Sequence, residues 1–223
     1  MEVFIALHTW WIDPFISNGF MRNALVAGLL AVLATSVIGT WVVLRGVTFL
    51  GDALAHGVLP GVAIAFVIGM NPTLGAFVAT IAMVGGINLV REHSSLPEDA
   101  AIGVLFVGFL ALAVVIMSGH SGSYVGDLNR FLFGSITGVN SGDLRRQAIA
   151  AAISLAGVIV FYRAFLAMTF DEVQARMLRL RPRLSHFVLL VLLSISVVAS
   201  FETVGSLLVL GFLIAPPATA TLL

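Results

Sequence analysis

The chain contains no cysteine and no lysine, and only 10% of its 223 residues carry a charged side chain. The absence of cysteine excludes disulfide frameworks, thiol catalysis and thiolate metal sites. Any metal site must therefore be built from aspartate, glutamate, histidine or backbone oxygen. The eleven basic and eleven acidic residues cancel, so the chain has no net positive charge of the kind that attracts nucleic acid. We expect no nucleic-acid partner.

Hydrophobic residues take the place of the missing charge. They make up 60% of the sequence, and the mean hydropathy is +1.11. Seven apolar stretches alternate with polar turns: residues 24–44, 49–70, 73–90, 100–117, 148–167, 186–200 and 205–223. Backbone groups in lipid must be hydrogen-bonded within each spanning segment. The stretches therefore predict an all-α integral membrane protein, a polytopic bundle of about seven spans.

The segments outside these stretches are less regular. Residues 1–19 contain the pair Trp10 and Trp11, which is typical of the lipid headgroup region, and we expect an interfacial segment there. Residues 119–143 are rich in glycine and partly apolar, which predicts either an amphipathic surface helix or a re-entrant piece. Residues 1–223 as a whole are expected to form a single transmembrane domain.

Two turns carry recognisable helix-start signals. Asn71-Pro72 predicts a turn followed by a helix with proline in its first position. Ser95 precedes Glu98 by three residues, which is the spacing of a capping box and predicts a cap before the span that starts near residue 100. Glu98 and Asp99 lie where a helix N-terminus favours negative charge.

Arginine alone indicates the orientation in the membrane, because the chain has no lysine. Four arginines lie in one loop, namely Arg176, Arg179, Arg181 and Arg183. If that loop is in the cytoplasm, Arg45 and Arg91 lie on the cytoplasmic side too. The arginines then left outside are Arg22, Arg130, Arg145 and Arg146. The positive-inside rule favours this orientation, with the N-terminus outside.

Asp52 and His56 stand four residues apart in GDALAHGVLPG, residues 51–61, a segment that must enter the membrane. On a helix this spacing puts both side chains on one face, roughly 6 Å apart along the axis. An ionisable residue at that depth is a functional-site hypothesis. A carboxylate with an imidazole suits zinc, manganese and iron alike. The alternative is a buried hydrogen-bonded pair that holds this helix against a neighbour.

A site made of Asp52 and His56 alone is incomplete, because zinc or manganese takes four or more ligands. A two-fold dimer would bring the pairs of both chains to one axis. The chain has no GxxxxGK[ST] motif, the P-loop that would bind the phosphates of ATP. Two alternatives remain open. An intramembrane metal enzyme would need a fuller ligand set such as HExxH, and a secondary transporter would work without an ATPase.

Charge is concentrated after the fifth apolar stretch, in FDEVQARMLRLRPR at residues 170–183. Acidic, apolar and basic residues alternate there at helical spacing, which predicts a short cytoplasmic docking helix. The alternative is an ordinary basic loop that binds anionic headgroups.

Four further stretches can be compared with known families. They are GDALAHGVLPGVAIAF at 51–66, PEDAAIGVLF at 97–106, NRFLFGSITGV at 129–139 and ETVGSLLVLGFLIAPPATATLL at 202–223. Together they resemble the permease subunits of bacterial ATP-binding-cassette importers for zinc and manganese, in the order found in that family.

The resemblance implies a fold similar to the vitamin B12-type permease and a homodimer in the bacterial plasma membrane. It implies that the chain catalyses no reaction and holds no permanent cofactor. An extracellular or periplasmic binding protein would deliver the metal, and two cytoplasmic ATPase subunits would drive its import. Asp52 and His56 match the acid and histidine that line the family's translocation path. The segment at 168–184 matches the family's ATPase-docking segment through Phe170, Asp171, Glu172, Ala175 and Arg176.

The sequence departs from the family pattern in two places. The family usually has a glycine shortly after the docking segment, where this chain has Met177-Leu178-Arg179. The family also usually has eight spans, one more than the seven counted here.

Overall fold

The computed structural model describes residues 13–119, 133–135 and 138–222, and within these residues it contains helices and no strand. The helices are α2 Asp13–Ser17, α3 Gly19–Leu44, α4 Phe49–Gly57, α5 Leu59–Val67, α6 Pro72–His93, α7 Glu98–Ser118, α9 Ser141–Phe170, α10 Glu172–Met177, α11 Pro182–Val204 and α12 Ser206–Thr221. The predicted all-α class is confirmed. Most of the two irregular segments, 1–19 and 119–143, lies outside the described residues.

Six stretches of this structure are long and apolar enough to cross a bilayer. They correspond to the first six predicted spans, with α4 and α5 together forming the second. The seventh predicted span forms α12, which is shorter, at 16 residues. The structure thus agrees with a polytopic bundle.

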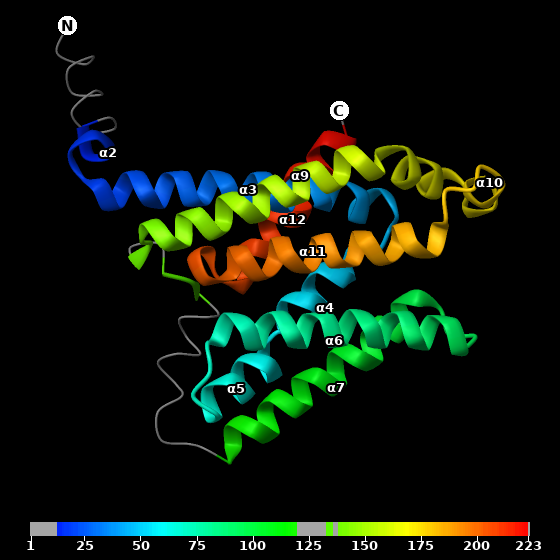
Figure 1. Ribbon diagram of the computed structural model, residues 1–223, viewed down its shortest axis with the longest axis horizontal. Helices are drawn as coiled ribbons and strands as arrows, with labels where there is room; N and C mark the ends of the chain where they lie inside the picture. The colour runs from blue at the N-terminus through cyan, green and yellow to red at the C-terminus, as the bar shows by residue number, and fades with distance from the viewer. Residues whose placement is uncertain (1–12, 120–132, 136–137, 223) are drawn as a thin grey trace, which may run out of the picture.

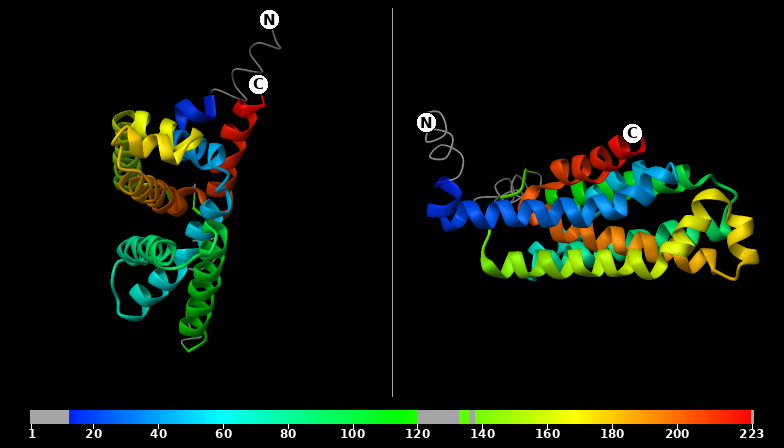
Figure 2. Two further views of the ribbon diagram at one scale, coloured as in Figure 1. Left: turned by 90° about the vertical axis from the view of Figure 1, so that its right-hand side faces the viewer. Right: turned by 90° about the horizontal axis from the view of Figure 1, so that it is seen from above.

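The helices are arranged in two groups (Figures 1 and 2). One group contains α3, α9, α10, α11 and α12, and the other contains α5, α6 and α7, with packing contacts within each. Two elements join the groups: α6 packs against α11, and α4 contacts α7 as well as α11 and α12. The candidate metal-binding pair lies on α4, where the two groups meet.

One end of the bundle is marked by α10, at the right of Figure 1. The C-terminal ends of α3 and α6 reach this end, where Arg45 bonds to His186 of α11 and Arg91 pairs with Glu172 of α10. The arginines that the sequence predicts on one side of the membrane therefore do lie at one end. We call it the α10 end.

Both predicted helix starts can be checked. Asn71 Oδ1 accepts a hydrogen bond from Thr73 N at 2.9 Å, and Pro72 is the first helical residue, so that prediction is confirmed. The capping box at Ser95 is wrong, because α7 begins at Glu98 with Pro97 before it and no side-chain cap. A residue that precedes proline is biased away from helical geometry, which delays the helix until after Pro97.

A capping box does occur elsewhere. Asn140 Oδ1 accepts from the backbone N–H groups of Gly142 and Asp143, and Asp143 Oδ2 accepts from Asn140 N. It starts α9 seven residues before the predicted apolar span, which begins at residue 148.

Arg179, in the position range where the resembling family usually has glycine, has a left-handed backbone with φ of +56°. This conformation costs an L-residue roughly 1–2 kcal/mol. Glycine relieves this strain but also adds entropy to the unfolded chain. Arg179→Gly should therefore raise the free energy of unfolding by a net amount of roughly 0.5–1 kcal/mol. Thermal unfolding in detergent measures the change. Arg176→Gly, inside helical α10, is the control and should lower the stability. A destabilised Arg179→Gly protein would contradict the strain argument.

Candidate metal site

The pair Asp52 and His56 lies on α4, in its first and last turn respectively. Their side chains are on the same face, with His56 Nδ1 3.7 Å from Asp52 Oδ1. That distance is too long for a hydrogen bond, so the two groups do not satisfy one another. The predicted spacing is confirmed, while their role is not decided by it.

The rest of α4 is used for packing, which determines where the pair can face. Leu50 and Leu54 are fully buried in the core. A Cβ added to Gly51 would lie 2.2 Å from Leu213 Cδ2 of α12, and one added to Gly57 would lie 2.2 Å from Met83 Sδ of α6. The small residues of GDALAHG thus let two helices approach α4 closely. Its remaining face carries the pair.

The surroundings of the pair are aromatic rather than charged. The Phe106 ring of α7 lies 5.9 Å from the His56 ring and 5.6 Å from the Phe49 ring. The side chains of His56 and Asp52 are 24% and 32% exposed. The His56 Nδ1 atom is buried and has no hydrogen-bond partner among the described residues. The pair therefore places an imidazole and a carboxylate on the same face, and neither satisfies the other.

The helix is interrupted between α4 and α5, immediately after the pair. Pro60 has no N–H to donate to the carbonyl of His56, four residues earlier, which interrupts the helical hydrogen bonds at this point. Asp52 and His56 therefore lie on a short helix of nine residues, just before the interruption within the second span.

One copy of the described chain does not hold a complete metal site. Among residues 13–119, 133–135 and 138–222, no group of three or more histidine, aspartate or glutamate side chains could hold a metal ion. The pair could supply half of a four-coordinate site, as the sequence predicts.

The five predicted docking residues do not share one role. Asp171 caps α10, its Oδ1 accepting from Val173 N at 2.7 Å. Glu172 pairs with Arg176 at 3.3 Å in the same helix and with Arg91 of α6 at 3.7 Å. Ala175 is 0% exposed and fixes α10 against the bundle. Phe170, at the end of α9, projects from it.

Sequence analysis missed the apolar side chains beside Phe170. Phe170, Val173 and Met177 are 82%, 57% and 79% exposed. Val173 and Met177 are four residues apart in α10, which is the spacing of one helix face, so that part of the signal was present in the sequence. Phe170 lies at the end of α9, before the extended residue Asp171. His186 was also missed. It is buried at the α10 end, where Arg45 Nη1 donates to its Nδ1 at 2.9 Å.

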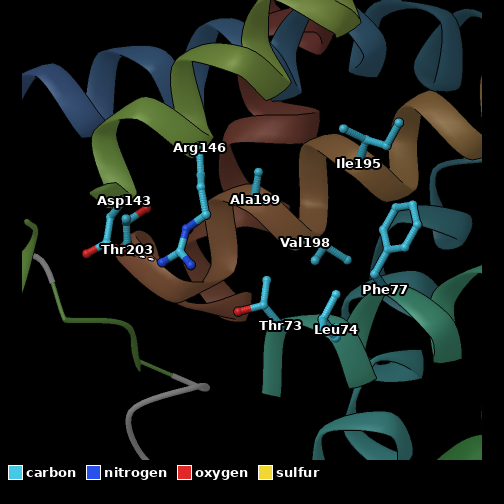
Figure 3. A pocket seen from close by; sticks show the side chains of 9 residues that line it. All are labelled: Thr73, Leu74, Phe77, Asp143, Arg146, Ile195, Val198, Ala199 and Thr203. Carbon is cyan, nitrogen blue, oxygen red and sulfur yellow. Dashed lines mark hydrogen bonds and ion pairs between the residues drawn. The ribbon is translucent and has the colours of Figure 1, made fainter. Parts of the chain in front are cut away.

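A cavity of about 210 Å³ lies at the opposite end of the bundle, between α6 and the helices α9 and α11. Figure 3 shows its lining residues, which include the ion pair between Asp143 and Arg146. The cavity does not include the α4 pair. At its edge, where Thr203 lines it, Gln147 of α9 bonds to Ser200 and Thr203 of α11 at 3.2 and 3.0 Å, which ties these two helices together.

Comparison with known proteins gives consistent matches over nearly the whole chain. The sequence model of the ABC 3 transport family matches residues 17–223. The manganese transport system membrane protein MntC of Listeria innocua is 38% identical over 96% of this chain and 75% of its own length. A probable iron transport system membrane protein of Haemophilus influenzae is 33% identical over 95% of this chain and 77% of its own length.

One solved structure is similar throughout. PsaBC from Streptococcus pneumoniae, in complex with Fab, has a chain that superposes with a TM-score of 0.81 and 32% sequence identity. The match covers 96% of this chain and 76% of that one.

Proposed function

The chain belongs to the ABC 3 transport family, and from this premise we propose that it forms the path of a divalent metal ion in an ATP-driven importer, paired with a second identical chain. It is a permease subunit, a multi-pass protein of the bacterial inner membrane, and not an enzyme. ATP hydrolysis belongs to a separate subunit. We propose that two such ATPases bind the two permeases, and that a binding protein delivers the metal.

The observation that carries the proposal is the pair Asp52 and His56, which shares a partly exposed face of α4 without forming a hydrogen bond. A carboxylate in a low-dielectric bundle is costly unless a cation compensates it. Two copies of the pair around a two-fold axis would offer four ligands. The site must also bind weakly enough to release the ion.

Manganese is the metal we favour. The similar proteins from Listeria innocua and Haemophilus influenzae are named for manganese and iron transport. Aspartate and histidine suit manganese, iron and zinc alike, so zinc stays within the proposal as a competitor.

We propose that the α10 end faces the cytoplasm and that residues 168–184 couple the permease to the ATPase. Six arginines lie at or beside that end, which agrees with the positive-inside rule. Asp171 and Ala175 would shape and anchor α10, while the exposed row of Phe170, Val173 and Met177 would contact the ATPase. Residues 1–19 would form the interfacial lead-in of one transmembrane domain.

The proposal is tested by manganese uptake into proteoliposomes that contain the permease and its ATPase, with iron(II) and zinc as competitors. Uptake should require both ATP and the ATPase subunit, and the purified complex should contain two copies of each. Uptake without the ATPase would indicate a secondary transporter. Absence of ATP-dependent uptake of all three metals would overturn the proposal.

The exposed apolar side chains that we assign to the ATPase contact give a separate prediction. Phe170→Ala or Met177→Ala should weaken binding of the purified ATPase about tenfold, equivalent to about 1.4 kcal/mol, because these exposed apolar side chains would be buried in the interface. Val160→Ala is the matched control, since Val160 is 75% exposed but lies in the middle of α9. Equal affinities for the Phe170, Met177 and Val160 variants would contradict the assignment.

A further inference from the structure

Arg91 stands where three helices meet. It lies in the last turn of α6, and its Nη2 is 3.7 Å from Glu172 Oε1 at the start of α10. Its charge also acts on His186, a buried residue near the start of α11. Arg91 is therefore in electrostatic contact with the segment that we assign to the ATPase and with the start of the helix that follows it.

The pair Arg91 and Glu172 joins the two helix groups. Glu172 belongs to α10, which packs on α9 and α11, whereas Arg91 belongs to α6, which packs on α5 and α7. Both side chains are partly shielded from solvent, so their attraction is screened less than that of a fully exposed pair. A displacement of α10 would thereby act across the boundary on α6.

Helix α6 in turn packs closely against α5, which adjoins the helix that carries the metal-binding pair. Gly61 of α5 and Gly75 of α6 touch backbone to backbone, since a Cβ added to either would lie within 2.2 Å of the other's carbonyl oxygen. Only Val58 separates α5 from α4. Movement of α6 therefore shifts α5 and, through it, the end of α4 at His56.

The Glu172 carboxylate has a second partner, which makes the bridge to Arg91 breakable. Arg176 Nη2 lies 3.3 Å from the same Oε1 atom, within α10. When α6 and α10 move apart, Glu172 keeps Arg176 and is not left uncompensated. Glu172 therefore has an ion-pair partner within α10 whether or not Arg91 lies beside it.

The far end of α6 has room for such a movement. There Thr73, Leu74 and Phe77 face Ile195, Val198 and Ala199 of α11 across the cavity of about 210 Å³ (Figure 3). Close-packed helices resist displacement, whereas a cavity lets one helix tilt without overlapping its neighbour.

We infer that Arg91 is a positioning residue that carries movement of the ATPase-docking helix α10 to α6, and so to the helix pair that bears Asp52 and His56. The inference rests on the proposed function, because it assumes that α10 meets an ATPase. It adds a residue outside the docking segment and a path from that segment to the metal.

The test uses the complete permease–ATPase complex in proteoliposomes and measures manganese transported per ATP hydrolysed. Arg91→Glu should lower this ratio about five- to tenfold, with ATP hydrolysis retained. Glu172→Arg should do the same. The double variant Arg91→Glu, Glu172→Arg restores an opposite-charge pair and should recover most of the ratio. Glu92→Arg, a reversal at the neighbouring exposed position of α6, should leave it unchanged.

The outcomes separate this inference from the proposed function. A wild-type complex without ATP-driven uptake would overturn both. A wild-type complex that transports, with an Arg91→Glu variant of equal ratio, would overturn the inference alone. Failure of the charge swap to restore the ratio would also overturn it, because the bridge would then not be the contact that matters. If Arg91→Glu does not fold, Arg91→Gln removes the attraction without adding repulsion and should lower the ratio as well.

Discussion

His56→Ala should abolish metal uptake while leaving the protein folded in the membrane. The substitution removes an imidazole whose Nδ1 has no hydrogen-bond partner among the described residues, so little native bonding is lost. Loss of a metal ligand should reduce transport roughly 100-fold or more, since even residues that only support a ligand are worth 10- to 100-fold in metal affinity. His93→Ala is the matched control, because His93 is exposed at the end of α6.

Asp52→Asn should act in the same way, because it keeps the shape of the side chain and deletes its charge. Asp99→Asn, at an exposed position in the first turn of α7, is its control. Uptake is normalised to folded protein, which is measured by thermal unfolding in detergent. A purely structural pair predicts the reverse pattern, with reduced melting temperature and unchanged transport per folded molecule. Normal uptake by a well-folded double variant would exclude the transit site.

The span boundaries could be predicted where a strong local signal coincides with the edge of an apolar run. The first span was expected to end at residue 44, and α3 ends there, before Arg45. Asn71-Pro72 gave the start of α6. The start of α9 was missed because its first turns are polar, and an apolar stretch was counted only from residue 148. Gln147 in these turns is nevertheless buried against Ser200 and Thr203 of α11.

Only the local contacts among the functional residues could be predicted from the sequence. Asp52 and His56 are local partners, and helical spacing alone brings them together. The bond between Arg45 and His186 joins residues 141 positions apart, and the bridge from Arg91 to Glu172 depends on how α6 meets α10. Such contacts are fixed by packing between helices that are distant in the sequence, which no periodicity in one segment encodes.

The contact between α5 and α6 depends on two glycines. A Cβ at Gly61 would lie 2.0 Å from the carbonyl oxygen of Gly75 and 2.5 Å from Ala79 Cβ. A Cβ at Gly75 would lie 2.2 Å from the carbonyl oxygen of Gly61 and 2.6 Å from Ala65 Cβ. Backbone atoms cannot rotate away as a flexible side chain can. A methyl group at either position therefore forces the two helices apart. Small residues at membrane helix contacts normally allow such close approach of the backbones.

Gly61→Ala and Gly75→Ala should each destabilise the protein by about 1–3 kcal/mol, the usual cost of overpacking. In a chain of this size the apparent melting temperature in detergent should fall by roughly 2–12 °C. Gly85→Ala, on α6, is the control: a Cβ there meets nothing within 4 Å, and alanine favours a helix over glycine by about 1 kcal/mol. The control should therefore melt at or above the wild-type temperature. If all three variants melt alike, the helices are not held at backbone contact, and the path from α6 through α5 to His56 loses its mechanical basis.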